Sequence, residues 1–140
     1  MMRWQAYALG SAFFAGLTAI FGKLGVTSID PDVATLLRTG VILLLTFSIV
    51  LARGARWPEG GLGLRGAAFI TLSALCTGLS WVFYYRALRD GPASRVAALD
   101  KLSVAFVLAP AVLFLGERPS PRTAAGCLLV AAGSWLAARG

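Results

Sequence analysis

The fold is decided by residues 93–115, which read ASRVAALDKLSVAFVLAPAVLFL and hold the adjacent charges Asp100 and Lys101. As a helix, this apolar stretch is long enough to cross a hydrocarbon core about 30 Å thick, and Lys101 would lie roughly 12 Å from its start. Ionisable groups at that depth are costly and usually face a bundle interior or a wet cavity. We therefore expect the function of the protein to depend on this segment.

The rest of the chain has the composition of a membrane protein. Hydrophobic residues make up 58% of its 140 residues and charged residues only 14%, whereas a soluble domain has about 25% charged residues. Five apolar segments lie at about residues 4–24, 32–52, 65–85, 93–115 and 121–138. The sequence thus predicts an all-α, polytopic membrane protein, one domain over residues 1–140 with five transmembrane helices: a four-helix core and a dimerising fifth helix.

Charge and residue usage narrow the function classes. The net charge is +7, but the basic residues flank apolar segments, which favours contact with the lipid bilayer over nucleic-acid binding. The chain has no histidine, so it lacks the commonest metal ligand and any catalytic triad that needs one. Cys76 and Cys127 fall inside predicted spans without metal-ligand spacing and are interpreted as packing residues. We expect neither a metal site nor a cofactor.

The second segment opens with a helix-start signal. Asp30 is placed as the N-cap, Pro31 as the first helical residue and Asp32 in the first turn. Arg38 follows about two turns into the span, and two interpretations of it stay open. Its side chain either snorkels to the membrane interface or binds an anion or carboxylate inside the helix bundle.

The third segment carries a possible cavity wall. Thr77, Trp81 and Tyr85 recur every four residues and so share one face of a helix. Trp81 is deep enough to line a cavity, whereas Tyr85, close to the end, equally suits an interfacial aromatic belt. Arg86 and Arg89 are expected in the turn that follows.

The two charges of the fourth segment are predicted to need outside partners. Consecutive helical residues point about 100° apart, so Asp100 and Lys101 are not expected to meet. At least one of them should find a partner on another helix, and Arg38 is a candidate for Asp100.

Pro110 lies in the second half of the same segment and is predicted to kink the helix near Phe106, because proline removes one backbone hydrogen bond. Ser103 lies one turn from Asp100 and joins the candidate site. The candidate substrate-binding or coupling residues are Arg38, Thr77, Trp81, Tyr85, Asp100, Lys101 and Ser103.

The last segment predicts self-association. Gly126 and Gly133 lie a heptad apart and give a face for close helix–helix contact, which is the predicted dimer interface. Five spans would place the two ends on opposite sides, and the loop Lys and Arg residues then divide six against six. One set comprises Arg3, Arg53, Arg56, Arg65, Arg118 and Arg122, and the other comprises Lys23, Arg38, Arg86, Arg89, Arg95 and Arg139. An equal count gives no preferred orientation, which predicts an antiparallel homodimer formed by dual-topology insertion, although a parallel dimer could use the same face.

Several motifs resemble a known family. The run from Tyr84-Tyr85-Arg86-Ala87-Leu88 to Gly116-Glu117-Arg118, with the Ala-Ser-x-Val-Ala start at residue 93 and the Leu37-Arg38 pair, strongly resembles the EamA-type repeat of the drug/metabolite transporter superfamily. The likeness covers essentially the whole chain as one five-helix repeat and is closest to the single-repeat branch. Many relatives carry a proline near residues 103–104, where this chain has Ser103 and Val104. The last helix also resembles that of small multidrug resistance proteins, but the first span lacks their essential glutamate.

The resemblance implies transport of a small metabolite across the cell (inner) membrane, with two oppositely oriented repeats around a central site. From the residues alone, three function classes are weighed. A transporter accounts for the intramembrane charges, the small-residue faces and the broken helix. A membrane enzyme would need a nucleophile–base pair or a metal cluster, and this chain lacks both. A structural or accessory subunit gives no reason for two charges within a span.

Overall fold

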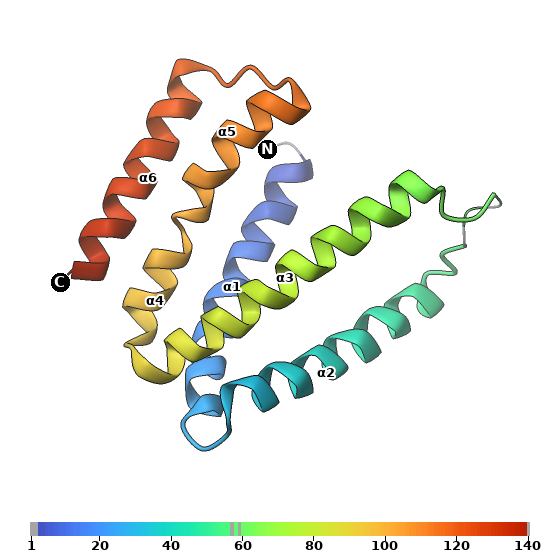
Figure 1. Cartoon of the computed structure of the whole chain (residues 1–140), viewed down its shortest axis with the longest axis horizontal. Coiled ribbons are helices and arrows are strands. Elements are labelled where there is room, and N and C mark those ends of the chain that lie inside the picture. Colours follow the sequence, from blue (N-terminus) through green and yellow to red (C-terminus); the bar gives the residue numbers. More distant parts are fainter. Residues whose placement is uncertain (1–2, 57, 59, 140) are drawn as a thin grey trace. The chain divides into compact units, whose positions relative to one another are not determined.

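The computed structural model describes residues 3–56, 58 and 60–139, and every regular element in them is a helix (Figure 1). In chain order the helices are α1 (Arg3–Val26), α2 (Pro31–Ala52), α3 (Leu64–Asp90), α4 (Ala93–Asp100), α5 (Ser103–Leu115) and α6 (Pro121–Arg139). The predicted all-α fold is confirmed. Two boundaries differ from the prediction: α3 continues to Asp90, and the fourth segment is divided into α4 and α5.

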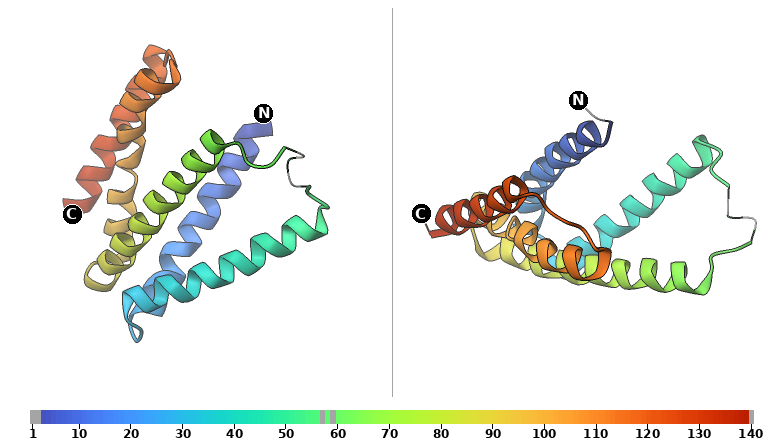
Figure 2. Two further views of the ribbon diagram at one scale, coloured as in Figure 1. Left: turned by 45° about the vertical axis from the view of Figure 1, so that its right-hand side comes forward. Right: turned by 90° about the horizontal axis from the view of Figure 1, so that it is seen from above.

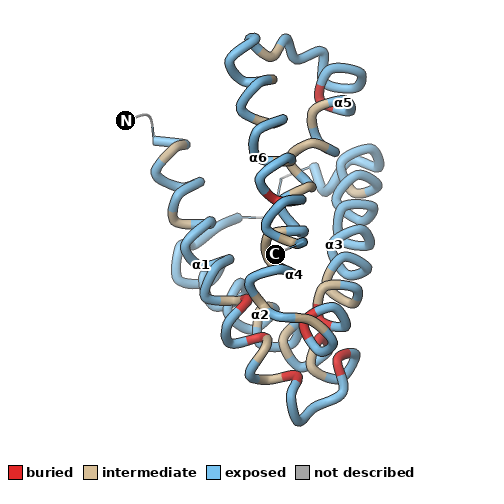
Figure 3. Tube along the Cα trace, turned by 90° about the vertical axis from the view of Figure 1, so that its left-hand side faces the viewer, coloured by how far each residue is buried: buried red, intermediate tan, exposed pale blue. Residues whose placement is uncertain are grey.

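Among the described residues, four stretches are long and apolar enough to cross a membrane. They are Arg3–Val26, Pro31–Ala52, Leu64–Asp90 and Ala93–Leu115, the last of which joins α4 and α5. Most of every helix is exposed in the isolated chain (Figure 3), including large apolar side chains such as Phe114, which is 84% exposed. Such surfaces suit lipid rather than water. The multi-pass character is therefore supported, while the crossing of the 19-residue α6 stays a prediction.

The start of α2 is fixed by its cap. The Asp30 carboxylate accepts hydrogen bonds from the backbone N–H groups of Asp32 (2.9 Å) and Val33 (3.4 Å), and Pro31 is the first helical residue. This geometry satisfies two of the N–H groups that lack partners at a helix start. The predicted N-cap is confirmed.

The connection between α5 and α6 is built from two local signals. Gly116 adopts a left-handed conformation (φ 65°), and the next N–H, that of Glu117, donates to the Ala111 carbonyl at 3.1 Å. Glycine reaches this conformation without steric cost, so α5 ends here. The Ser120 hydroxyl then accepts from the Thr123 N–H at 3.1 Å and caps α6.

The chain divides into two compact units, which are described separately. The first contains the described residues up to Leu24 together with those from Asp90 onward. Here α6 packs along α4 and α5, as both views in Figure 2 show. The Lys23 ammonium donates to the Gly91 carbonyl at 3.0 Å and so joins the end of α1 to the turn before α4. The packed side of α6 is marked by its buried or partly buried residues, Ala124, Cys127, Ala131, Ser134 and Ala138.

The second unit, Gly25–Arg89, contains α2 and most of α3. These helices come together where α2 begins and α3 ends, and they diverge toward the loop that joins them (Figure 1). The buried residues of this unit all lie near that closed end, and they are Val26, Pro31, Thr35, Tyr85 and Leu88. The candidate residues on these two helices are therefore held by packing at one end only.

Candidate functional site

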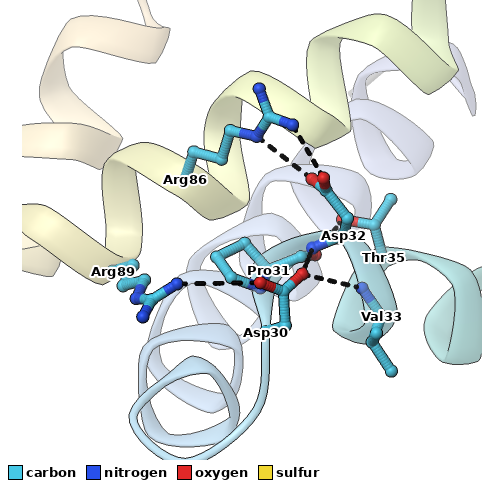
Figure 4. Close-up of polar contacts among 7 residues, drawn as sticks. All are labelled: Asp30, Pro31, Asp32, Val33, Thr35, Arg86 and Arg89. Carbon is cyan, nitrogen blue, oxygen red and sulfur yellow. Dashed lines mark hydrogen bonds and ion pairs between the residues drawn. The ribbon is translucent and has the colours of Figure 1, made fainter.

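A bidentate ion pair joins the start of α2 to the end of α3. The Arg86 guanidinium donates to both oxygens of the Asp32 carboxylate, at 3.1 Å from Nε and 2.7 Å from Nη2 (Figure 4). Two parallel N–H···O bonds fix orientation as well as distance. They therefore set the register of the two antiparallel helices.

A second pair lies beside the first. Arg89 approaches the Asp30 carboxylate at 3.8 Å, so Asp30 both caps α2 and faces a cation on α3 (Figure 4). The sequence analysis placed Arg86 and Arg89 in a turn, which is wrong: both belong to α3. Arginine is a good helix former, and carboxylates at the start of α2 face both charges.

Arg38 lies against two of the predicted cavity residues. Its guanidinium carbon is 4.1 Å from the centre of the Trp81 ring and 5.4 Å from that of the Tyr85 ring. Both distances fall within the range of cation–π attraction. Trp81 and Tyr85, predicted to share one face of α3, thus both contact Arg38 of α2.

The three predicted residues on α3 differ in exposure. Thr77 is exposed, and its hydroxyl donates to the Ser73 carbonyl at 2.9 Å. Trp81 is half-buried and Tyr85 is buried. Tyr85 therefore packs inside its unit, whereas Tyr7 on α1 is exposed. That Thr77, Trp81 and Tyr85 line one cavity opposite Lys101 stays a prediction.

The fourth segment is interrupted at Lys101 and Leu102. Between α4 and α5 the backbone bonds span three residues rather than four: the N–H of Lys101 donates to Ala98 and that of Leu102 to Leu99. Such bonds mark a tightened turn. The interruption lies about one turn before the kink predicted near Phe106, because α5 accommodates Pro110 within a continuous helix.

Asp100 and Lys101 pair with each other at this turn. The Lys101 ammonium donates to the Asp100 carboxylate at 3.4 Å. The expectation that these side chains cannot meet is wrong, because Lys101 lies in the turn after α4 rather than one position along a regular helix. The predicted contact between Asp100 and Arg38 stays a prediction.

A pocket of about 620 Å³ lies between α5, α6 and their connecting loop. Ser103, the remaining predicted site residue, lines it from the first turn of α5. The lining is mostly apolar, with hydroxyls and a few charges at the loop, and comprises Ser103, Val104, Val107, Leu108, Ala111, Glu117, Arg118, Pro119, Ser120, Thr123 and Cys127. Its size suits a small organic molecule.

The two glycines of the predicted dimer interface lie away from the packed side of α6. Gly126 and Gly133 are exposed, and a methyl group added at either would meet no atom within 4 Å. Neither glycine is therefore required for packing within the described part of the chain.

Comparison with known proteins identifies the family. Residues 2–139 match the model of the EamA-like transporter family. The chain belongs to this family. It is also 48% identical, over 135 residues that cover 96% of each chain, to a Sinorhizobium sp protein described as an uncharacterized transporter in the cobO 3′ region. No solved structure matches the chain. The resemblance stated from the motifs is confirmed, and the protein is a membrane transporter with a single EamA repeat.

Two features of this EamA-like transporter escaped the sequence analysis. One is the pairing of Asp32 with Arg86, which only the fold brings together. The spacing does hold a signal: two acids at the start of one span and two arginines at the end of the next form a complementary set if the helices are antiparallel. The other is the pocket wall on α6, where Thr123 and Cys127 lie one turn apart.

Proposed function

We propose that the protein carries a small metabolite across the membrane by alternating access. The observation that carries this proposal is the interrupted span: α4 and α5 belong to one membrane-length segment, and the Asp100–Lys101 pair lies at the break between them. Broken helices in transporters occur where the backbone lines a cavity, and their ends supply groups that bind substrate or coupling ions.

The functional unit is an antiparallel homodimer in the cell (inner) membrane. A single repeat lacks the inverted partner that encloses a central site in such transporters, and a copy inserted in the opposite orientation supplies it. Without Arg38, which lies within α2, the Lys and Arg residues divide six against five, and so small a bias allows both orientations. The glycine face of α6 is open for contact with the second copy.

Transport is tested with the purified full-length protein in lipid vesicles. Its uptake of labelled organic anions, organic cations and sugars is compared with that of protein-free vesicles. We expect saturable uptake of one class. No uptake of any class, by protein that is folded and inserted, would contradict the proposal.

Topology and dimerisation are tested together in cells and membranes. A reporter fused at the C-terminus should be active on both sides of the membrane, and two lysines added to one loop should restrict it to one side. Gly126→Leu should weaken chemical cross-linking between copies. Gly40→Leu is the matched control, since it adds the same side chain at another exposed helical glycine with no atom within 4 Å. Activity on one side only would exclude dual topology.

A further inference from the structure

The Arg38 guanidinium lies over two aromatic rings of α3. The Asp32–Arg86 pair places those residues level with each other on antiparallel helices. Arg38, six residues further along α2, is therefore level with the region of Trp81 on α3. Its guanidinium is closer to the Trp81 ring (4.1 Å) than to the ring of Tyr85 (5.4 Å), which lies one turn nearer the end of α3.

Among the described residues of its own unit, the charge of Arg38 has no carboxylate partner. The described carboxylates of residues 25–89 are Asp30 and Asp32, and both are engaged, with Arg89 and Arg86. A guanidinium carries five N–H donors and no acceptor. Stacking on an aromatic ring uses its face and leaves these donors, which lie in the plane at the edge, available to a ligand.

From these contacts we propose that Arg38, Trp81 and Tyr85 form an anion-binding subsite, and that the transported metabolite carries a carboxylate or phosphate group. This inference rests on the proposed transport function and names its substrate class. Arg38 provides the fork that binds two oxygens of the anion. Trp81 and Tyr85 hold the guanidinium group in place, so the Arg38 side chain loses less conformational entropy when the anion binds.

The same geometry disfavours an organic cation as the substrate. Exposed aromatic faces are the surfaces that bind quaternary ammonium groups. Here the protein's own cation already covers the faces of Trp81 and Tyr85. A second cation would lose that contact and meet a like charge.

Binding is measured without any requirement for transport. Trp81 fluorescence is recorded in detergent-solubilised full-length protein whose other tryptophans are replaced by phenylalanine. The probes are benzoate, inorganic phosphate and tetraethylammonium, titrated at constant ionic strength. We expect benzoate or phosphate to change the fluorescence saturably and tetraethylammonium to leave it unchanged.

Three variants define the role of the arginine. Arg38→Gln should raise the dissociation constant for the anion about 10- to 100-fold, the range expected for losing hydrogen bonds to a charged group. Arg38→Lys keeps the charge but not the two-pronged donor group, so its dissociation constant for the anion should lie between those of Arg38→Gln and the parent. The matched control, tested in protein that retains Trp135, is Arg139→Gln, because Arg139 lies 4.7 Å over that ring outside the proposed subsite. It should leave anion affinity unchanged.

Two results would overturn the proposal: equal anion affinity in the parent and Arg38→Gln, or binding of tetraethylammonium in preference to both anions. A lipid phosphate as the occupant is distinguished by adding phosphatidylglycerol to the micelles. If this lipid displaces benzoate while inorganic phosphate does not, the subsite binds headgroups and the substrate class is wrong. Anion binding without flux would instead leave the subsite in place and contradict the transport proposal.

Discussion

Replacing the charges at the helix break, singly and together, separates a role in transport from a role in stability. The three variants are Asp100→Asn, Lys101→Met and the double substitution. In the parent protein the two charges are 3.4 Å apart. Each single variant leaves one charge of the pair without its partner, whereas the double variant leaves none.

The size of the coupling follows from that distance. Two unit charges 3.4 Å apart attract by about 1 kcal/mol in water and by about 5 kcal/mol at an effective dielectric constant of 20. A charge left alone at mid-membrane costs about 2.5–3.5 kcal/mol by insertion scales. We therefore expect a coupling free energy between about 1 and 5 kcal/mol, with a value near the lower limit if water reaches the break.

The coupling is obtained from a double-mutant cycle, in which the free energy of unfolding of the parent and the three variants is measured in mixed micelles. Flux is measured in vesicles for the same four proteins. The double variant should be more stable than the sum of the single effects predicts. All three variants should lose flux, because each removes at least one of the two ionisable groups at the break, and neither asparagine nor methionine carries a charge or exchanges a proton.

Normal flux in the double variant would refute the functional role and reduce the pair to a structural contact. A coupling below about 0.5 kcal/mol would refute the pairing itself, since that is the usual error of additivity. A variant that fails to insert is distinguished from an inactive one by its yield in the membrane fraction.

Two further predictions concern α3. Leu88 has 0% exposure and Leu113, on α5, has 77%. Leu88→Ala should therefore lower the free energy of unfolding by about 2–4 kcal/mol, and Leu113→Ala should lower it by less than about 0.5 kcal/mol. Equal effects would contradict the packing of Leu88 where α2 begins and α3 ends. In a cysteine-free background, Thr77→Cys should react with a water-soluble thiol reagent faster than Leu72→Cys, because Thr77 is predicted to face the cavity. Equal rates would place Thr77 on the lipid side.

The helix bounds could be predicted because apolar length and local caps determine them. Asp30 and Gly116 act through their own backbone neighbours, and the structure places both at helix ends as their residue types indicate. The end of α3 was harder to predict, because its last turns are polar. Arg86 was assigned to the turn before Gly91 and Pro92, whereas α3 continues to Asp90 and Arg86 pairs with Asp32 within it.

The helix break was predicted from the wrong residue. Proline is a visible signal, but a single Pro110 removes only one backbone bond, and α5 retains its helical form around it. The interruption at Lys101 depends on how the turn between α4 and α5 tightens, which no single residue type announces. The stacking of Arg38 on Trp81 was likewise beyond the sequence, since both interpretations of Arg38 were compatible with its depth.

The proposed anion subsite has a consequence for the transport cycle. The empty subsite holds the charge of Arg38 without a carboxylate from its own unit, and a bound anion neutralises it. If transport follows the proposed alternating access, the subsite passes through a closed, low-dielectric state, in which an uncompensated charge costs several kcal/mol. Since each 1.4 kcal/mol corresponds to about a factor of ten, the loaded protein should change conformation at least about tenfold faster than the empty one.

The transporter should therefore favour exchange over net release. Vesicles preloaded with a labelled anionic substrate should lose it at least about tenfold faster when the outer buffer contains the same unlabelled anion than when it contains none. An Arg38→Gln variant that still transports should show a smaller ratio, because its empty form carries no charge to bury. Equal rates of loss in the two buffers for the parent protein would show that the charge of Arg38 does not limit the return step.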